Sequence, residues 1–345
     1  MTYPRFNDAL PLALDASVLQ SIDYVLIGIG SLILLMTLGR WAVRGVPDPL
    51  RTAPRRLNTL TPELAILPFL VWMVGSYLSD GLIAVINHRA AAPLVPEDLR
   101  KLLMATGGQI TGSIACLWVG GVYFREGFVG FGFRRKGFWG DLVFAVLAIV
   151  AVIPMLFLLN EITAAVISLF QTDFQPPPHK LLQTLETPEQ PAWATPVLWA
   201  SAVLIAPVAE ELFFRGIIQT GLRHVFTEGD LGRPEEPRAF PVVALDPAGA
   251  SAEPTDLAGE PTEASPGAPG MRVPRGRGKW PAILITGALF GMVHYPQPHA
   301  VPALILFGIA LGYAYEKRGS LVPCIAMHVL FNLKTMLWFT ARGLQ

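Results

Sequence analysis

Residues 141–169 read DLVFAVLAIVAVIPMLFLLNEITAAVISL, and positions 142–160 of this stretch carry no charged side chain. A helix of about 20 mostly apolar residues crosses the hydrocarbon core of a bilayer. This stretch therefore predicts a transmembrane helix. The whole chain shares its character, because 52% of the 345 residues are hydrophobic, 15% are charged and the mean hydropathy is +0.47. Soluble domains carry about 25% charged residues, so we expect an integral membrane protein.

The same pattern recurs along the chain and predicts an all-α, polytopic transmembrane helical bundle of about eight spans. The sixth and seventh expected spans are the shortest. The sequence shows neither a soluble domain nor a convincing internal repeat. The expected spans are 19–41, 62–87, 102–124, 141–169, 193–224, 280–295, 299–316 and 320–340.

Basic residues concentrate in alternate connections, which predicts the orientation of the bundle. Segments 39–60 and 125–140 and the turn at 317–318 are basic, whereas 170–192 has only Lys180 and 295–300 has neither Lys nor Arg. Basic connections stay in the cytoplasm. We therefore expect a multi-pass protein of the plasma membrane with both termini outside. The N-terminal sequence lacks the pattern of a cleaved signal peptide.

Two segments differ from the apolar spans. Residues 227–279 are rich in Pro, Gly, Ala and Glu and predict a disordered cytoplasmic loop, because they cannot bury enough apolar area to offset their ordering entropy. Residues 179–186, HKLLQTLE, predict a short amphipathic helix at the outer face. The net charge of zero gives no field that favours nucleic acid. Cys116 and Cys324 lie in apolar stretches and do not indicate a disulfide framework.

Three charged residues lie deep in the fifth expected span, Glu210, Glu211 and Arg215. Each costs roughly 2.5–3.5 kcal/mol near the bilayer centre, so the three together require a reason. Glu211 and Arg215 are four residues apart and are expected to form an ion pair on one helical face. Glu210 points about 100° away and has no partner in its own helix. Pro207 frees the carbonyl of Val203 and predicts a kink just before the acidic pair.

Two histidines follow in separate expected spans. His294 ends the sequence Phe290-Gly-Met-Val-His in the sixth, and His328 shares a face of the eighth with Asn332, four residues further on. With about 1.5 Å of rise per residue, Glu210 and His294 lie roughly 20 Å from the cytoplasmic ends of their helices, and His328 roughly 12 Å. The three side chains are therefore predicted to share one layer.

Two further acidic residues and two pairs of glycines also lie within the expected spans. Asp80 and Glu161 lie outside this polar layer, and we expect both to face the bundle interior or a cavity. Two GxxxG patterns favour close helix packing beside the layer, and they are Gly287/Gly291 and Gly308/Gly312.

A carboxylate and histidines in a water-poor cavity can activate water, with the carboxylate as general base. A histidine and an amide can donate hydrogen bonds to the oxyanion that develops. The same residue types could instead hold a metal. The chain contains no HExxH sequence, which is typical of a zincin-type protease site. It also contains neither GxSG nor GxGD, the usual local sequences of serine and aspartyl intramembrane proteases.

Together the three motifs resemble a known family. EExxxR at 210–215, FxxxH at 290–294 and HxxxN at 328–332, in this order on membrane helices, are similar to the CPBP family of intramembrane proteases. That family includes the type II CAAX prenyl endopeptidases and the Abi and bacteriocin-immunity proteins. The resemblance covers about residues 179–340 and implies an eight-helix bundle with a membrane-embedded cavity. It divides the chain into four N-terminal helices, 1–169, and a catalytic part, 170–345, interrupted by the loop 227–279, which is unusual for the family.

By this resemblance, the predicted catalytic residues are Glu210, His294, His328 and Asn332, and the supporting residues are Glu211, Arg215 and Phe290. Glu210 and His294 would activate the water, and His328 and Asn332 would stabilise the oxyanion. The family is called metallopeptidase, so Glu210, His294 and His328 would be the ligands of a zinc ion. A glutamate-dependent reaction without metal is the other reading, and the sequence leaves both open.

The resemblance implies an endopeptidase acting on a membrane-associated or prenylated, CAAX-type polypeptide in the lipid bilayer. Two other functions fit a polar network inside a bundle. A transporter would usually have repeated halves with interrupted helices, and no repeat is seen. A non-catalytic membrane scaffold or bacteriocin-immunity-type factor would keep its function when Glu210 is replaced.

Overall fold

The apolar stretches of the sequence form helices throughout the part of the chain that can be described. The computed structural model describes residues 16–45, 49–50, 53–54, 58–90, 94–133, 137–171, 191, 193–227, 279–295 and 297–342. Within these ranges the chain is almost entirely helical and has no strand, apart from a single bridge between Asn58 and Phe124. The predicted all-α, polytopic bundle is confirmed.

The helices follow the expected spans in order. The N-terminal half contains α1 (Ala16–Arg44), the short turn η2 (Pro62–Ala65) leading into α2 (Ile66–Arg89), α3 (Glu97–Tyr123), the turn η3 (Gly127–Phe131) and α4 (Phe138–Ser168). A continuous helical rod then consists of α6 (Ala194–Ala200), η4 (Ser201–Ile205), α7 (Ala206–Glu211), η5 (Leu212–Gln219) and α8 (Thr220–Thr227). The last three helices are α9 (Lys279–Met292), α10 (Val301–Arg318) and α11 (Val322–Arg342).

Six of these helices are long and apolar enough to cross a membrane, so the chain is an integral membrane protein. They are residues 17–44, 62–89, 97–123, 138–168, 194–226 and 322–341. The sixth and seventh expected spans do form helices, α9 and α10, but both fall short. α9 has 14 residues and is therefore about 21 Å long, against a hydrocarbon core of about 30 Å. α10 has 18 residues and its last turn is charged.

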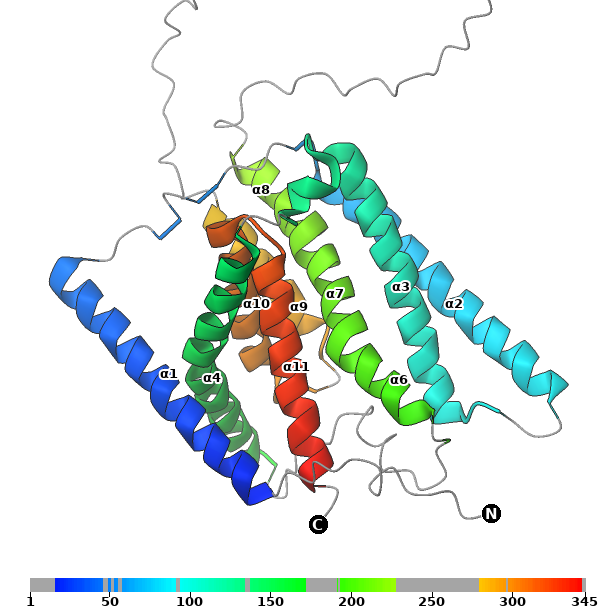
Figure 1. The fold of residues 1–345 in the computed structure, drawn as a ribbon, viewed down its shortest axis with the longest axis horizontal. Coiled ribbons are helices and arrows are strands. Elements are labelled where there is room, and N and C mark those ends of the chain that lie inside the picture. Colours follow the sequence, from blue (N-terminus) through cyan, green and yellow to red (C-terminus); the bar gives the residue numbers. More distant parts are fainter. Residues whose placement is uncertain are drawn as a thin grey trace, which may run out of the picture.

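The direction of the helices alternates along the chain, as Figure 1 shows. α1 begins and α11 ends at the lower end of this view. At the upper end, α1 ends and α2 begins, α3 ends and α4 begins, and α10 ends and α11 begins. The three basic connections of the sequence are thus flanked by helix ends that lie towards the same end of the bundle. The placement of this end in the cytoplasm stays a prediction.

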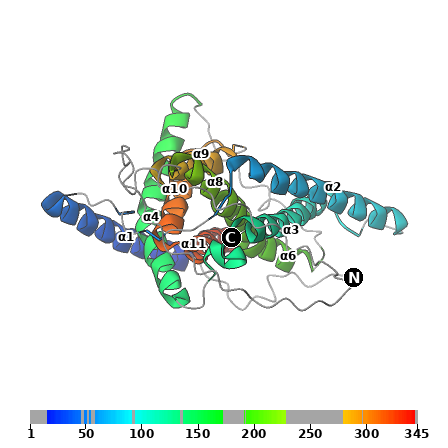
Figure 2. The ribbon, with the colours of Figure 1, turned by 90° about the horizontal axis from the view of Figure 1, so that it is seen from above.

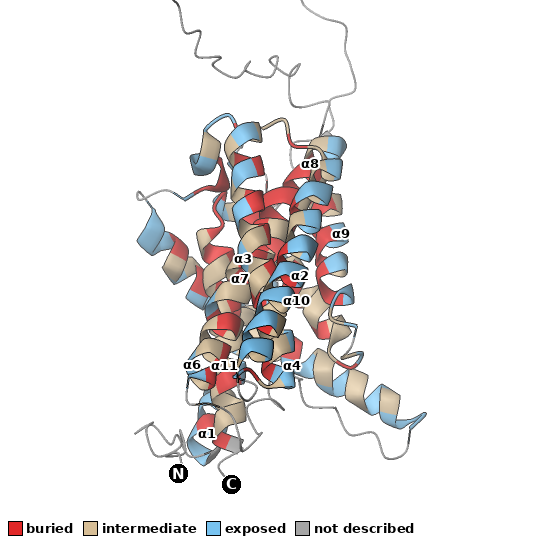
Figure 3. Cartoon of the chain, turned by 90° about the vertical axis from the view of Figure 1, so that its right-hand side faces the viewer, coloured by how far each residue is buried: buried red, intermediate tan, exposed pale blue. Residues whose placement is uncertain are grey.

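One hydrophobic cluster joins the helices of both halves. It includes Phe131 in η3, Leu212 in the rod, Phe290 in α9 and Phe307 in α10. Buried residues gather where the helices pack against one another, and exposed residues cover the outer faces (Figure 3). α1 and α2 extend to opposite sides of this centre (Figure 2), and their outer faces expose large apolar side chains suited to lipid. The division of the chain into four N-terminal helices, 1–169, and a catalytic part, 170–345, stays a prediction.

The two other intramembrane acids differ from each other. Asp80 of α2 accepts two hydrogen bonds from Arg100 of α3, at 2.7 and 2.8 Å, and both side chains are half-buried. Glu161 of α4 is exposed, so the expectation that it faces the interior is wrong, because α4 turns that side outward. The predicted helix 179–186 lies outside the described residues, and so does the predicted loop 227–279 apart from its two end residues.

Candidate active site

The rod that carries the acidic pair is not a uniform α-helix. α7, with Glu210 and Glu211, lies between two π-helical segments, η4 and η5. In a π turn an amide donates to the carbonyl five residues back, and such turns are frequent at functional sites. At the end of η4 the amide of Ala206 donates to the carbonyl of Ser201, and Pro207 follows without an N–H. The distortion expected at this proline is therefore a change of hydrogen-bond register.

Glu211 is fully buried and, together with Arg215, links the rod to α10 and α11. Its Oε1 accepts hydrogen bonds from Nη1 of Arg215, at 3.0 Å, and from Nδ1 of His328 in α11, at 2.8 Å. Nη2 of Arg215 donates to the carbonyl of Gly308 in α10, at 3.0 Å. The ion pair expected between Glu211 and Arg215 is thus present. The network fixes α7 against α10 and α11.

His328 lies between the two glutamates. Because its Nδ1 faces the Glu211 carboxylate, which only accepts when ionised, Nδ1 carries a hydrogen and Nε2 points the other way. Nε2 lies 3.9 Å from Oε2 of Glu210, whose side chain is 17% exposed. Among the described residues this Oε2 has no hydrogen-bond partner. Nε2 of His328 and Oε2 of Glu210 therefore face each other at the site.

The ring of Phe290 connects the second histidine to this network. It packs against His328, with ring centroids 5.5 Å apart, and against His294, at 5.1 Å. The guanidinium carbon of Arg215 lies 4.6 Å from the centroid of the same ring, a distance suited to a cation–π contact. Phe290 thus supports three polar side chains of the site at once.

His294 lies beyond the end of α9, in the turn that leads to α10, and not inside a helix as the sequence predicted. Its Nδ1 lies 2.7 Å from the carbonyl oxygen of Phe290. A carbonyl can only accept, so Nδ1 is the protonated nitrogen and Nε2 of the neutral ring has a free lone pair. In the described part of the chain no hydrogen bond or ion pair joins His294 to Glu210.

Asn332 lies one turn after His328 on α11 and faces the rod. Its Nδ2 donates to the carbonyl of Ala202 in η4, at 2.8 Å. The structure therefore brings Glu210, Glu211, Arg215, Phe290 and His328 into one contact network, and it places His294 and Asn332 at its two margins.

The expected zinc ligands do not meet the requirement for a metal site. Within the described ranges there is no group of three or more His, Cys, Asp or Glu side chains that could hold a metal ion.

Sequence reasoning missed a second buried polar cluster, towards the upper end of the rod. Glu316 of α10 is buried, and its carboxylate faces Nε2 of Gln219, at 3.3 Å, and Nη1 of Arg223, at 3.4 Å. Glu316 directly precedes the basic residues Lys317 and Arg318, so the sequence suggested a basic turn and not a buried carboxylate. The spacing of Gln219 and Arg223, four residues apart on one helical face, was the available signal.

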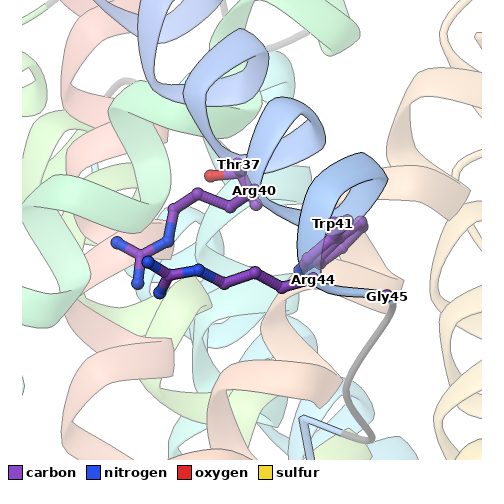
Figure 4. Close-up of a pocket in the computed structure, with 5 residues that line it drawn as sticks. All are labelled: Thr37, Arg40, Trp41, Arg44 and Gly45. Carbon is purple, nitrogen blue, oxygen red and sulfur yellow. The ribbon is translucent and has the colours of Figure 1, made fainter.

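A surface hollow of about 490 Å³ lies at the end of α1 and is lined by Thr37, Arg40, Trp41, Arg44 and Gly45 (Figure 4). The described residues that line it include neither a carboxylate nor an imidazole. Peptide hydrolysis by activated water needs such a base, so the hollow is not the candidate active site.

A comparison with protein-family models agrees with the position of the network. Residues 192–246 and 266–334 match the model described as type II CAAX prenyl endopeptidase Rce1-like. The matched residues include all three motifs, and the interruption at 247–265 falls inside the segment predicted to be a loop. No curated protein and no solved structure matches the chain.

Proposed function

We propose that this chain is an intramembrane endopeptidase, because residues 192–246 and 266–334 match the family model of Rce1-like type II CAAX prenyl endopeptidases. Its substrate is a membrane-associated or prenylated polypeptide, and its base is Glu210. The observation that carries the proposal is the buried Oε2 of Glu210, which faces Nε2 of His328 across 3.9 Å without a hydrogen-bond partner in the described chain.

In the proposed reaction, Glu210 is ionised and His328 carries protons on both nitrogens. The oxygen of a water molecule attacks the carbonyl carbon of the scissile peptide, and one proton of that water passes to Glu210. Nε2–H of His328 donates to the oxyanion that forms. The C–N bond then breaks, and Glu210 returns its proton to the leaving amine.

Glu211 prepares His328 for this role. Its buried carboxylate holds Nδ1–H of His328 at 2.8 Å, so the imidazolium keeps its second proton directed to the reacting side. Arg215 compensates the charge of Glu211 at 3.0 Å. His294 contributes Nε2 as an acceptor that orients the attacking water, since its Nδ1–H is occupied by the Phe290 carbonyl.

The test is cleavage of a farnesylated peptide with a CAAX-type C-terminus by the purified chain in detergent or liposomes. Glu210→Gln keeps the shape of the side chain and removes the base, so kcat is expected to fall by about 10²–10⁴-fold with an unchanged melting temperature. Glu161→Gln is the matched control, because Glu161 is an exposed glutamate of α4. It is expected to cleave at the wild-type rate.

Two outcomes would reject the proposal. Glu210→Gln could cleave the peptide as fast as the wild type. Alternatively, the folded wild-type chain could show no turnover of any prenylated or membrane-anchored peptide, as expected of a non-catalytic scaffold.

A further inference from the structure

The side-chain amide of Asn332 donates a hydrogen bond to the backbone of the rod. We infer that Asn332 is a positioning residue that sets the hydrogen-bond register of the helix carrying Glu210. The inference rests on the proposed function for its effect on turnover, but not for its effect on stability. It departs from the oxyanion role that the sequence motif suggests for this residue.

The hydrogen bonding of η4 departs from that of an α-helix. In an α-helix the carbonyl of Ala202 would accept from the amide of Ala206, four residues on. That amide donates instead to the carbonyl of Ser201, five residues back. In the π register the partner of Ala202 would be residue 207, which is proline and has no N–H. The carbonyl of Ala202 is therefore left without a backbone donor.

α11 supplies the missing donor. Nδ2 of Asn332 lies 2.8 Å from this carbonyl oxygen, although the two residues are 130 positions apart in the sequence. An unpaired carbonyl inside a membrane bundle is strongly unfavourable. The contact therefore stabilises the π turn, because it pairs the one carbonyl, that of Ala202, for which the turn provides no backbone donor.

The register of this π turn affects the orientation of the two glutamates that follow it. A π turn contains about one residue more than an α turn, so it rotates the following helix by about 100° relative to an uninterrupted one. Glu210 and Glu211 follow within the next turn and a half. The directions of both carboxylates, towards Nε2 and Nδ1 of His328, therefore depend on this register.

α11 contacts the rod at two places. His328 and Asn332 are four residues apart on one face of that helix. His328 contacts the glutamates of α7, and Asn332 contacts η4 one turn away. α11 thus contacts the rod through both His328 and Asn332. The contact of Asn332 helps to keep His328 in position against the glutamates.

A double-mutant cycle between Asn332 and Pro207 tests the inference. Asn332→Ala is expected to lower the melting temperature by several degrees, because a buried carbonyl loses its partner. It is also expected to lower kcat by about 10²-fold with little change in KM, as misplacement of a catalytic group does. Pro207→Ala supplies an amide that satisfies Ala202 in the π register, or lets Ala206 do so in the α register.

In the Pro207→Ala background, Asn332→Ala is therefore expected to lower kcat by less than about threefold and to leave the melting temperature nearly unchanged, because the carbonyl no longer needs the side chain. An oxyanion donor would lose the same factor of about 10²–10³ in both backgrounds. Equal losses in the two backgrounds, in melting temperature or in kcat, would overturn the inference.

Thr335→Ala is the control for the cycle. It removes a side-chain hydrogen bond to the carbonyl of Phe331 within α11 and is expected to behave additively with Pro207→Ala. If the wild type does not cleave prenylated peptides, the proposed function fails, and the melting temperatures still decide whether Asn332 caps Ala202.

Discussion

At the scale of the residue, the site depends on one carboxylate that is shared by two cationic or proton-donating side chains. Glu211 is fully buried and accepts from Arg215 and His328 through the same oxygen. A buried ion pair adds little net stability, but removal of one partner leaves an uncompensated charge in a low dielectric. The sequence identified Glu211 and Arg215 as a supporting pair. It could not show that the pair also fixes the tautomer of His328.

Glu211→Gln is therefore expected to destabilise the chain by about 3–5 kcal/mol, because Arg215 loses its carboxylate while it stays buried. The measurement is thermal unfolding in detergent. The double variant Glu211→Gln/Arg215→Met is expected to be more stable than the single one, since no buried charge is left unpaired.

Glu97→Gln is the control for this prediction. The Glu97 side chain is 64% exposed and pairs with Arg100 and Lys101 near the start of α3, so its loss should change stability by about 0–1 kcal/mol. Equal shifts in melting temperature for Glu97→Gln and Glu211→Gln would contradict the role given to the buried network.

At the scale of the element, glycines decide how the two short helices pack. A Cβ at Gly308 of α10 would lie 2.9 Å from the Cα of Gly287 in α9, and a Cβ at Gly291 would lie 2.7 Å from the backbone nitrogen of Ile305. The predicted close approach of these helices is confirmed at these three glycines. Gly312 differs, because its nearest neighbour is the side-chain oxygen of Gln219 in the rod, at 2.6 Å.

Gly287→Ala is expected to destabilise the chain by about 1–3 kcal/mol, because the added methyl group meets the backbone of α10 at 2.8 Å and cannot be relieved by a side-chain rotation. Turnover should fall as well, since α9 carries Phe290 and leads to His294. Thermal unfolding and peptide cleavage measure the two effects.

Gly81→Ala in α2 provides the comparison. Nothing lies within 4 Å of its would-be Cβ, so the substitution should be neutral or stabilise the helix by up to about 1 kcal/mol. A Gly287→Ala variant as stable and active as Gly81→Ala would show that the α9–α10 contact does not constrain the site.

At the scale of the whole molecule, the helices alternate and place the flanks of the basic segments at one end (Figure 1). Sequence and structure together thus predict the topology, with the connection after α3 inside and the connection after α9 outside. The two native cysteines are suited to a labelling experiment, because Cys116 and Cys324 are fully buried and should give little background.

A cysteine introduced at Glu126 is expected to react with a membrane-impermeant thiol reagent only after the cells are permeabilised. A cysteine introduced at Pro298 is expected to react in intact cells. Both positions are exposed in the structure, so access to the reagent depends on the side of the membrane. Labelling of Glu126→Cys alone in intact cells would show that the orientation is reversed.

The sequence by itself determined the class of the molecule and the residue types of its chemistry. Apolar length and sparse charge predict membrane helices, and spacing of four residues predicts contacts within one helix, such as Glu211 with Arg215. These features depend on local periodicity, which a sequence displays directly. The same reasoning placed His294 inside a span, because hydropathy does not reveal that α9 ends at Met292.

The tertiary structure alone decided which atoms face one another across the bundle. His328 reaches Glu211 over 117 positions of sequence, and Asn332 reaches Ala202 over 130. Such contacts depend on helix crossing, on side-chain packing around Phe290 and on the π register of η4, and no local pattern specifies these. The residue types therefore indicate which reaction the site could catalyse. The positions of the reacting atoms are set only when helices distant in sequence pack together.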